Sequence, residues 1–207
     1  MKDGFVLGLT GKSGAGKNLA AAFLEKSGWI HFDTDKEAHR VLDGAGKEAA
    51  KLFGREILTE SGKVDRTRLG EIVFSSPEKM KQLESLLYPH IEESIICAVQ
   101  AKPDEKFVIN GANLTGSEPL CSLCDAVLVV RAPFWLRLWR SARRDRRPLF
   151  SLLKRFHYQK CFSVQEFFPQ ADIYTVSNIT TKAQFEKKLK RLMEKRILKN
   201  ERNSKRK

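Results

Sequence analysis

The apolar and polar positions of the chain form two kinds of segment. Short, mainly apolar runs are typical of strands buried in a parallel sheet, and such runs occupy residues 5–9, 29–32, 107–109, 126–130 and 173–176. Apolar residues at helical spacing predict helices after Lys17, through 135–139, over 149–158 and from about Lys182. Together these segments predict an α/β fold with a mainly parallel sheet.

The first predicted strand leads into a glycine-rich turn, a helix and a second strand. The helix ends at Gly28, and Asp33 and Asp35 lie at the carboxyl end of the second strand. This is a βαβ unit, and open parallel sheets bind their ligands at the carboxyl ends of the strands. We therefore expect a ligand site at this end of the sheet.

From Lys36 onwards the pattern is helical and charged, without a convincing strand. A long helical stretch between two strands indicates an inserted subdomain that can hold an acceptor molecule. We predict a core made of residues 1–35 and 106–200 and an insertion made of residues 36–105. The last residues, 201–207, are expected to be a disordered basic tail.

Composition narrows the protein class. No apolar run reaches the roughly 20 residues of a membrane span, and the first residues lack the layout of a signal peptide. We therefore expect a cytoplasmic protein without a membrane partner, as a monomer or weak oligomer. Cys121 and Cys124 form a lone CxxC, and because no second ligand pair completes a zinc site, reduced thiols are the favoured interpretation.

The net charge of +13 comes largely from two clusters. One is the C-terminal tail, and the other contains several arginines between Arg131 and Arg147. Basic clusters bind nucleic acids or phosphorylated small molecules. Since no nucleic-acid-binding motif accompanies them, nucleic-acid binding stays the less favoured alternative.

The glycine-rich turn fits the phosphate-binding pattern GxxxxGK, with the residues Gly11, Lys12, Ser13, Gly14, Ala15, Gly16 and Lys17. Glycines let backbone N–H groups surround a phosphate, and the following helix presents its positive end to the same anion. The lysine can reach the β- and γ-phosphates. Three fixed residues are a weak pattern, but its position between a strand and a helix makes it a strong candidate for a P-loop.

Asn18 departs from this pattern. Proteins with a complete motif have Ser or Thr here, whose hydroxyl binds Mg²⁺. An amide oxygen can bind Mg²⁺ directly or through water, so Asn18 is the candidate metal ligand, with a weakened site as the expected consequence.

The candidate catalytic residues are one carboxylate and two arginines. Asp33 could accept a hydroxyl proton in phosphoryl transfer, and its alternative role is to cap the next helix. Arg140 and Arg144 lie one helical turn apart, so they point to the same side and could meet a transferring phosphoryl group. A solvated helix face is the alternative for these arginines.

An ordered series of motifs resembles the dephospho-CoA kinase family, from about Val6 to Asn178. The matching residues are Gly8-Leu9-Thr10-Gly11, Asp33-Thr34-Asp35, Phe53-Gly54, Gly62, Asp65-Arg66, Leu69-Gly70, Val73-Phe74, Leu138, Arg140, Arg144-Asp145, Gln159, Ala171-Asp172 and Asn178. The chain departs from the family at Asn18, at Tyr88-Pro89 in place of His-Pro, and at Asn113 to Ser117 in place of Pro-Leu-Leu-x-Glu.

The resemblance implies a P-loop NTPase-like three-layer fold with a helical substrate-binding insertion and a helical lid at about 134–160. It implies a kinase that uses ATP and Mg²⁺ to phosphorylate the 3′-hydroxyl of dephospho-CoA. Asp33 would be the base, Asp35, Arg66 and Tyr88 would contact the acceptor, and Asn178 would contact the nucleotide. The alternatives are a kinase for another small acceptor, such as a nucleoside or nucleotide, and a nucleotide-binding protein that has lost catalysis.

Overall fold

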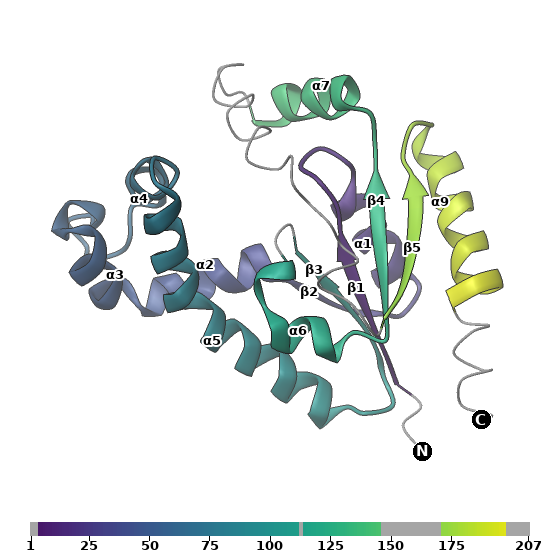
Figure 1. Ribbon diagram of the computed structural model, residues 1–207, viewed down its shortest axis with the longest axis horizontal. Helices are drawn as coiled ribbons and strands as arrows, with labels where there is room; N and C mark the ends of the chain where they lie inside the picture. Colours follow the sequence, from purple (N-terminus) through teal and green to yellow (C-terminus); the bar gives the residue numbers. More distant parts are fainter. Residues whose placement is uncertain (1–3, 112–113, 146–170, 198–207) are drawn as a thin grey trace. The chain divides into compact units, whose positions relative to one another are not determined.

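The computed structural model describes residues 4–111, 114–145 and 171–197 (Figure 1). The chain forms two compact units, one made of Met1–Phe32 and Lys102–Lys207 and the other of Asp33–Ala101. The predicted helix over 149–158, the end of the predicted lid, Gln159 and the basic tail at 201–207 lie outside the described residues.

The first unit contains a five-stranded sheet in the order β2-β3-β1-β4-β5. β1 pairs in parallel with β3 and β4, and β4 pairs in parallel with β5. The strands confirm the five predicted apolar runs, and their bounds are Phe5–Thr10 (β1), Ile30–Asp33 (β2), Lys106–Asn110 (β3), Ala126–Arg131 (β4) and Asp172–Ser177 (β5). Every residue of β1 is buried, which explains why its sequence from Phe5 to Leu9 is apolar at every position rather than at every second one.

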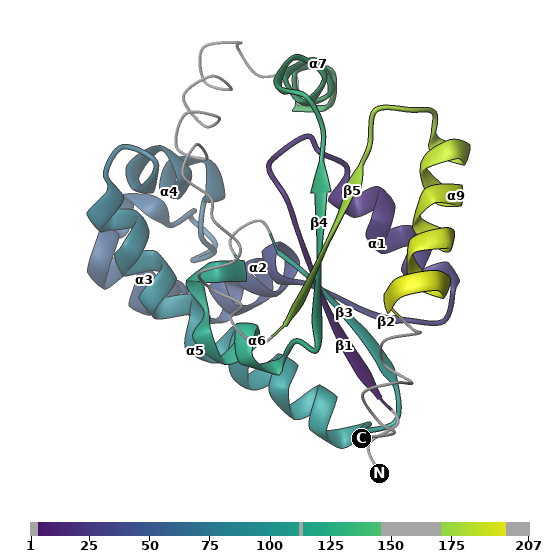
Figure 2. The same ribbon diagram turned by 45° about the vertical axis from the view of Figure 1, so that its right-hand side comes forward.

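Helices cover both faces of this sheet (Figures 1 and 2). On one face, α1 (Lys17–Lys26) and α9 (Lys182–Leu192) share a core with the strands, to which Leu7, Leu24 and Phe185 belong. On the other face, a Cβ added at Gly8 would meet the side chains of Leu114 and Cys124. These residues lie at the short turn η2 (Leu114–Gly116) and at the end of α6 (Glu118–Leu123). The two helical layers and the sheet confirm the α/β three-layer fold. The remaining described elements of this unit are α7 (Phe134–Asp145) and η3 (Met193–Ile197).

The second unit is helical, apart from an isolated bridge between Leu58 and Val64. Its elements are α2 (Thr34–Gly44), α3 (Gly46–Phe53), η1 (Arg55–Ile57), α4 (Arg66–Val73) and α5 (Pro77–Ala101). Its buried side chains include Leu42, Phe53, Ile57, Leu69 and Ile95. The unit runs from Asp33 to Ala101, a few residues away from the limits of 36 and 105 set by the sequence pattern.

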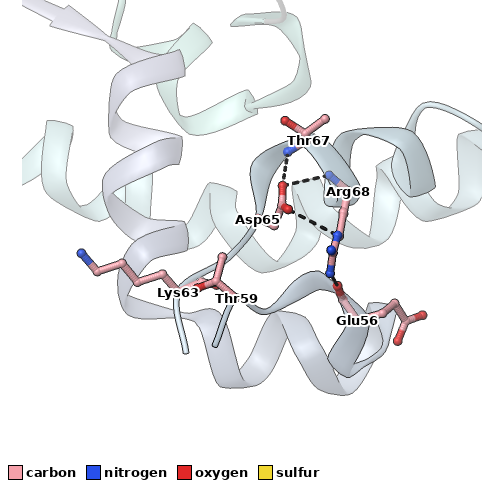
Figure 3. A network of polar contacts seen from close by, with 6 residues as sticks. All are labelled: Glu56, Thr59, Lys63, Asp65, Thr67 and Arg68. Atoms are coloured by element: carbon pink, nitrogen blue, oxygen red, sulfur yellow. Dashed lines mark hydrogen bonds and ion pairs between the residues drawn. The ribbon is translucent and has the colours of Figure 1, made fainter. Parts of the chain in front are cut away.

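Asp65 fixes where α4 begins (Figure 3). Its Oδ1 accepts hydrogen bonds from the backbone N–H groups of Thr67 at 3.0 Å and Arg68 at 3.2 Å. The Arg68 guanidinium lies 3.4 Å from the other carboxylate oxygen and donates to the backbone carbonyl of Glu56. These contacts cap the helix and place Arg66 as its first residue.

Candidate active site

The P-loop joins β1 to α1. Gly16 has a φ of 105°, a left-handed conformation that favours glycine. A Cβ at this position would also collide with the side-chain amide of Asn178. At the start of α1, the Lys17 ammonium donates a hydrogen bond of 2.9 Å to the Gly11 carbonyl, so its side chain arches back over the loop. This is the arrangement in which the loop amides and the lysine can surround a phosphate.

Asn178, directly after β5, joins three parts of this site. Its backbone N–H donates to the Arg131 carbonyl at 2.8 Å, and its side-chain amide donates to the Ala15 carbonyl at 2.9 Å. Its own carbonyl accepts a hydrogen bond of 3.1 Å from Arg140. The structure therefore places Asn178 against the P-loop backbone, and the predicted contact with the nucleotide stays a prediction.

Helix α7 brings arginines to the P-loop. Arg137 is buried, and the backbone of Gly14 approaches both the Arg137 backbone and the Ser141 side chain. Burial lowers the pKa of both Arg137 and Arg140. Both guanidinium groups nevertheless stay charged near neutral pH. The sequence pattern placed Arg137 only in the basic cluster. Arg144 is exposed, and its contact with a transferred phosphoryl group stays a prediction.

Asn18 contacts a residue that the sequence analysis did not select. Its side-chain oxygen accepts a hydrogen bond of 3.3 Å from the amide of Asn110, which is buried at the end of β3. The same Asn110 amide lies 3.5 Å from Nε2 of His31 on β2. One signal in the sequence could have pointed to Asn110. It is a polar residue at the carboxyl end of a strand, as Asp33 is on the neighbouring strand, and parallel sheets bind their ligands at these ends.

The donor set near the P-loop fits a magnesium ion. The Asn18 amide supplies a hard oxygen atom, and Mg²⁺ in phosphoryl-transfer sites keeps several waters and substrate phosphate oxygens as ligands. One or two protein oxygens are therefore sufficient. Among the described residues, no group of three or more His, Cys, Asp or Glu side chains could hold a metal ion.

Asp33 caps α2. Its Oδ1 accepts hydrogen bonds from the backbone N–H groups of Asp35 at 3.1 Å and Lys36 at 3.4 Å. The capping role considered in the sequence analysis is therefore confirmed, but α2 begins at Thr34 instead of Lys36. Asp35 is exposed in the first turn of the helix. The role of Asp33 as a base stays a prediction.

The other residues predicted to contact the acceptor also belong to the second unit. The Arg66 guanidinium donates to both carboxylate oxygens of Asp43, at 2.9 and 2.8 Å. Tyr88 is half-buried on α5. Neither residue lines the pocket of about 630 Å³ in this unit, whose lining includes Arg40, Glu48, His90, Glu93 and Cys97. The structure thus keeps Arg66 and Tyr88 apart from this pocket.

The CxxC pair is buried at the C-terminal end of α6. The thiols of Cys121 and Cys124 donate to the backbone carbonyls of Leu114 and Leu120, at 3.3 and 3.1 Å. Burial raises the pKa of Cys121 to about 11 and also raises the pKa of Cys124. Both groups are therefore protonated thiols near neutral pH.

None of the helices that the structure describes is long and apolar enough to cross a membrane.

Comparison with known proteins identifies the family. The sequence model of dephospho-CoA kinase matches residues 5–178 of this chain, which include the P-loop, Asp33, Arg140 and Asn178. The chain belongs to the dephospho-CoA kinase family. The resemblance found in the motifs is thereby confirmed.

Curated relatives agree with this assignment. A dephospho-CoA kinase of Treponema denticola is 33% identical over 202 residues, covering 92% of this chain and 90% of the relative. A dephospho-CoA kinase of Treponema pallidum is 32% identical over 183 residues, covering 84% of this chain and 86% of the relative. Similarity of this extent spans both the core and the insertion.

Solved structures show the same fold. A structure from Thermus thermophilus is similar with a TM-score of 0.76 and 25% identity, covering 94% of this chain and 99% of that one. A dephospho-CoA kinase from Campylobacter jejuni is similar with a TM-score of 0.61 and 26% identity, covering 92% of this chain and 96% of that one. A shikimate kinase from Acinetobacter baumannii, 18% identical with a TM-score of 0.53, shares the fold of the P-loop kinases.

Proposed function

We propose that this chain transfers the γ-phosphoryl group of ATP to the 3′-hydroxyl of dephospho-CoA and so produces coenzyme A and ADP. The observation that carries the proposal is the family match over residues 5–178. The P-loop geometry supports it, because the loop and the start of α1 form an anion site of the kind that binds nucleotide phosphates. We place the enzyme in the cytoplasm as a monomer or weak oligomer.

The P-loop residues bind the β- and γ-phosphates in this proposal. Their backbone N–H groups and the positive end of α1 stabilise the negative charge, and the Lys17 ammonium adds a point charge. Lys17 already crosses the loop toward the Gly11 carbonyl. Arg140 is held near the P-loop, because it donates a hydrogen bond to the carbonyl of Asn178, whose side chain contacts Ala15. With Arg144, it stabilises the charge that develops on the transferred phosphoryl group.

The magnesium ion neutralises charge on the phosphate oxygens when it is bound. Asn18 is the residue that would hold it, through the amide oxygen that now accepts the hydrogen bond from Asn110. The hydrogen bond from Asn110 would compete with the ion for this oxygen.

Asp33 accepts the proton of the attacking hydroxyl in our mechanism. Both capping hydrogen bonds end on its Oδ1, so we assign the proton to Oδ2. The cap fixes the side-chain orientation, which is what a positioned base requires. Asp35, Arg66 and Tyr88 would contact the acceptor, and Arg66 would have to exchange Asp43 for the acceptor's phosphates.

An assay of ADP release with ATP, Mg²⁺ and dephospho-CoA tests the reaction. Asp33→Asn is the sharpest variant, because asparagine keeps a capping oxygen but is not a base. We expect release that depends on dephospho-CoA and falls by about 10²–10⁴-fold in the variant, with unchanged thermal unfolding. No release in the presence of dephospho-CoA, from a protein that still binds ATP, would contradict the proposal and favour another acceptor or a silent nucleotide-binding protein. Asp33→Ala, which loses both roles, serves as the comparison.

A further inference from the structure

Helix α7 has two opposite faces. Arg137 and Ser141, one turn apart, are buried and approach Gly14 of the P-loop. Trp135 and Trp139 are also one turn apart, but each lies two residues before a buried position, which is about half a helical turn. They therefore project away from the P-loop, and they are 68% and 57% exposed.

The exposed face is positively charged as well as aromatic. The Arg143 guanidinium lies 5.6 Å from the centre of the Trp139 ring, which is a cation–π contact. We name Trp135, Trp139 and Arg143 the Trp face. Arg131, just before the helix, is exposed, and the sequence from Arg131 to Arg144 contains no acidic residue. The entire chain carries a net charge of +13.

We propose that the Trp face docks on the surface of an anionic lipid bilayer. Tryptophan favours the boundary between headgroups and hydrocarbon, because its ring is apolar and its N–H needs a polar partner. Arginine pairs with lipid phosphate groups and is attracted to an anionic leaflet. An amphipathic helix with both properties binds parallel to the bilayer without crossing it. This revises the sequence-based expectation that the protein has no membrane partner.

A second copy of the chain fits this face less well. Two facing copies would contribute four tryptophans that bury about 150–250 Å² each, below the roughly 1,200 Å² of a stable interface. A two-fold contact would also place both copies of Arg143 in the same interface, where like charges repel. Nucleic acid fits less well too, because single-strand binding proteins place aromatic rings within a groove that follows the phosphate backbone, whereas these rings project from one helix.

Tryptophan fluorescence of the full chain gives a direct test. The sequence has three tryptophans, and Trp29 is buried in the core, so the Trp face supplies the exposed emitters. We expect a blue shift when vesicles of phosphatidylcholine with phosphatidylglycerol are added, and no shift with phosphatidylcholine alone. A Trp139→Phe variant, which leaves Trp135 as the exposed emitter, should keep the shift. High salt should reduce it because the attraction is partly electrostatic.

Co-sedimentation with the same vesicles tests the residues. The double variant Trp135→Ser and Trp139→Ser should bind at least about tenfold more weakly. Phe74→Ser, which removes an aromatic ring of similar exposure on the other unit, should bind like the unchanged protein. Since all three side chains are exposed, thermal unfolding should stay the same in every variant.

Three results would overturn the proposal. The first is absence of binding to the anionic vesicles, or equal binding by the double tryptophan variant. The second is sedimentation of the free protein as a dimer that the double tryptophan variant abolishes. The third is binding to a single-stranded oligonucleotide that the double variant loses while vesicle binding persists.

Discussion

The side-chain amide of Asn178 donates a hydrogen bond of 2.9 Å to the carbonyl of Ala15, so a residue that directly follows the last strand fixes the backbone of the P-loop. Gly16 permits this contact, because any side chain there would collide with the Asn178 amide. The Asn178 carbonyl in turn accepts a hydrogen bond from Arg140. One buried residue thus connects the phosphate-binding loop to the helix that carries the arginines.

We expect Asn178→Ala to weaken ATP binding more than it lowers turnover. The substitution leaves the Ala15 carbonyl without this donor, a loss of about 1–3 kcal/mol for a buried group, and it loosens the loop that binds the phosphates. The KM for ATP should therefore rise by about tenfold or more, whereas the KM for the acceptor should change little. Steady-state kinetics with each substrate varied in turn measure both values.

The matched control for this prediction is Ser177→Ala, at the exposed neighbouring position on β5. It should leave both KM values unchanged. An Asn178→Ala enzyme with an unchanged KM for ATP would show that the P-loop keeps its conformation without this contact.

We expect Gly14→Ala to displace α7 from the P-loop. Gly14 has a φ of 75°, and a Cβ there would lie 2.9 Å from the Cα of Arg137 and 2.9 Å from the Ser141 hydroxyl. Backbone atoms cannot move aside as a flexible side chain can. The loss of stability should exceed the roughly 1–2 kcal/mol expected for a left-handed alanine alone, and thermal unfolding measures it.

Gly62→Ala separates the two causes of that loss. Gly62 has a nearly equal φ of 78°, but nothing lies within 4 Å of the added Cβ. Its loss of stability therefore reports backbone strain alone. Equal losses in the two variants would mean that α7 does not rest on Gly14.

The sequence predicted the strands and the P-loop because both depend on local patterns. Mostly buried parallel strands such as β1, β3 and β4 favour apolar runs, and a phosphate loop requires glycines at fixed positions. It did not select Asn110 or Arg137, because neither residue belongs to a local motif. Asn110 meets Asn18 only after two strands have paired, and the burial of Arg137 depends on how α7 packs on the loop.

Asp33 shows a second limit of sequence reasoning. The pattern allowed both a base and a helix cap, and it could not decide between them. The structure confirms the cap, whose hydrogen bonds occupy Oδ1. Asp33 can be a helix cap and a base at the same time, because a carboxylate has two oxygens. Finding the cap therefore neither supports nor excludes a role as a base. Kinetics of Asp33→Asn are needed to separate them.

The cysteines should differ strongly in reactivity toward alkylating reagents. Cys97 is exposed, whereas Cys121 and Cys124 are buried and donate hydrogen bonds to backbone carbonyls. Because the thiolate is the nucleophile, the raised pKa values of Cys121, about 11, and of Cys124 slow their reaction further. Mass spectrometry after iodoacetamide treatment at neutral pH should find label on Cys97 well before Cys121 and Cys124. Label on all three at similar rates in the folded protein would contradict the buried position of the pair.

We expect Asn18→Ser and Asn18→Thr to speed turnover when Mg²⁺ is limiting. A hydroxyl at the end of the P-loop is the usual protein ligand for this ion, whereas the Asn18 oxygen accepts a hydrogen bond from Asn110 that competes with metal binding. The Mg²⁺ concentration that gives half-maximal activity should fall by several-fold, and activity at saturating Mg²⁺ should change less. Asn18→Ala, which supplies no oxygen ligand, is the control and should need more Mg²⁺ than the unchanged enzyme. If all three variants show the same Mg²⁺ dependence as the unchanged enzyme, Asn18 is not a ligand and the ion is held by the nucleotide and by other residues.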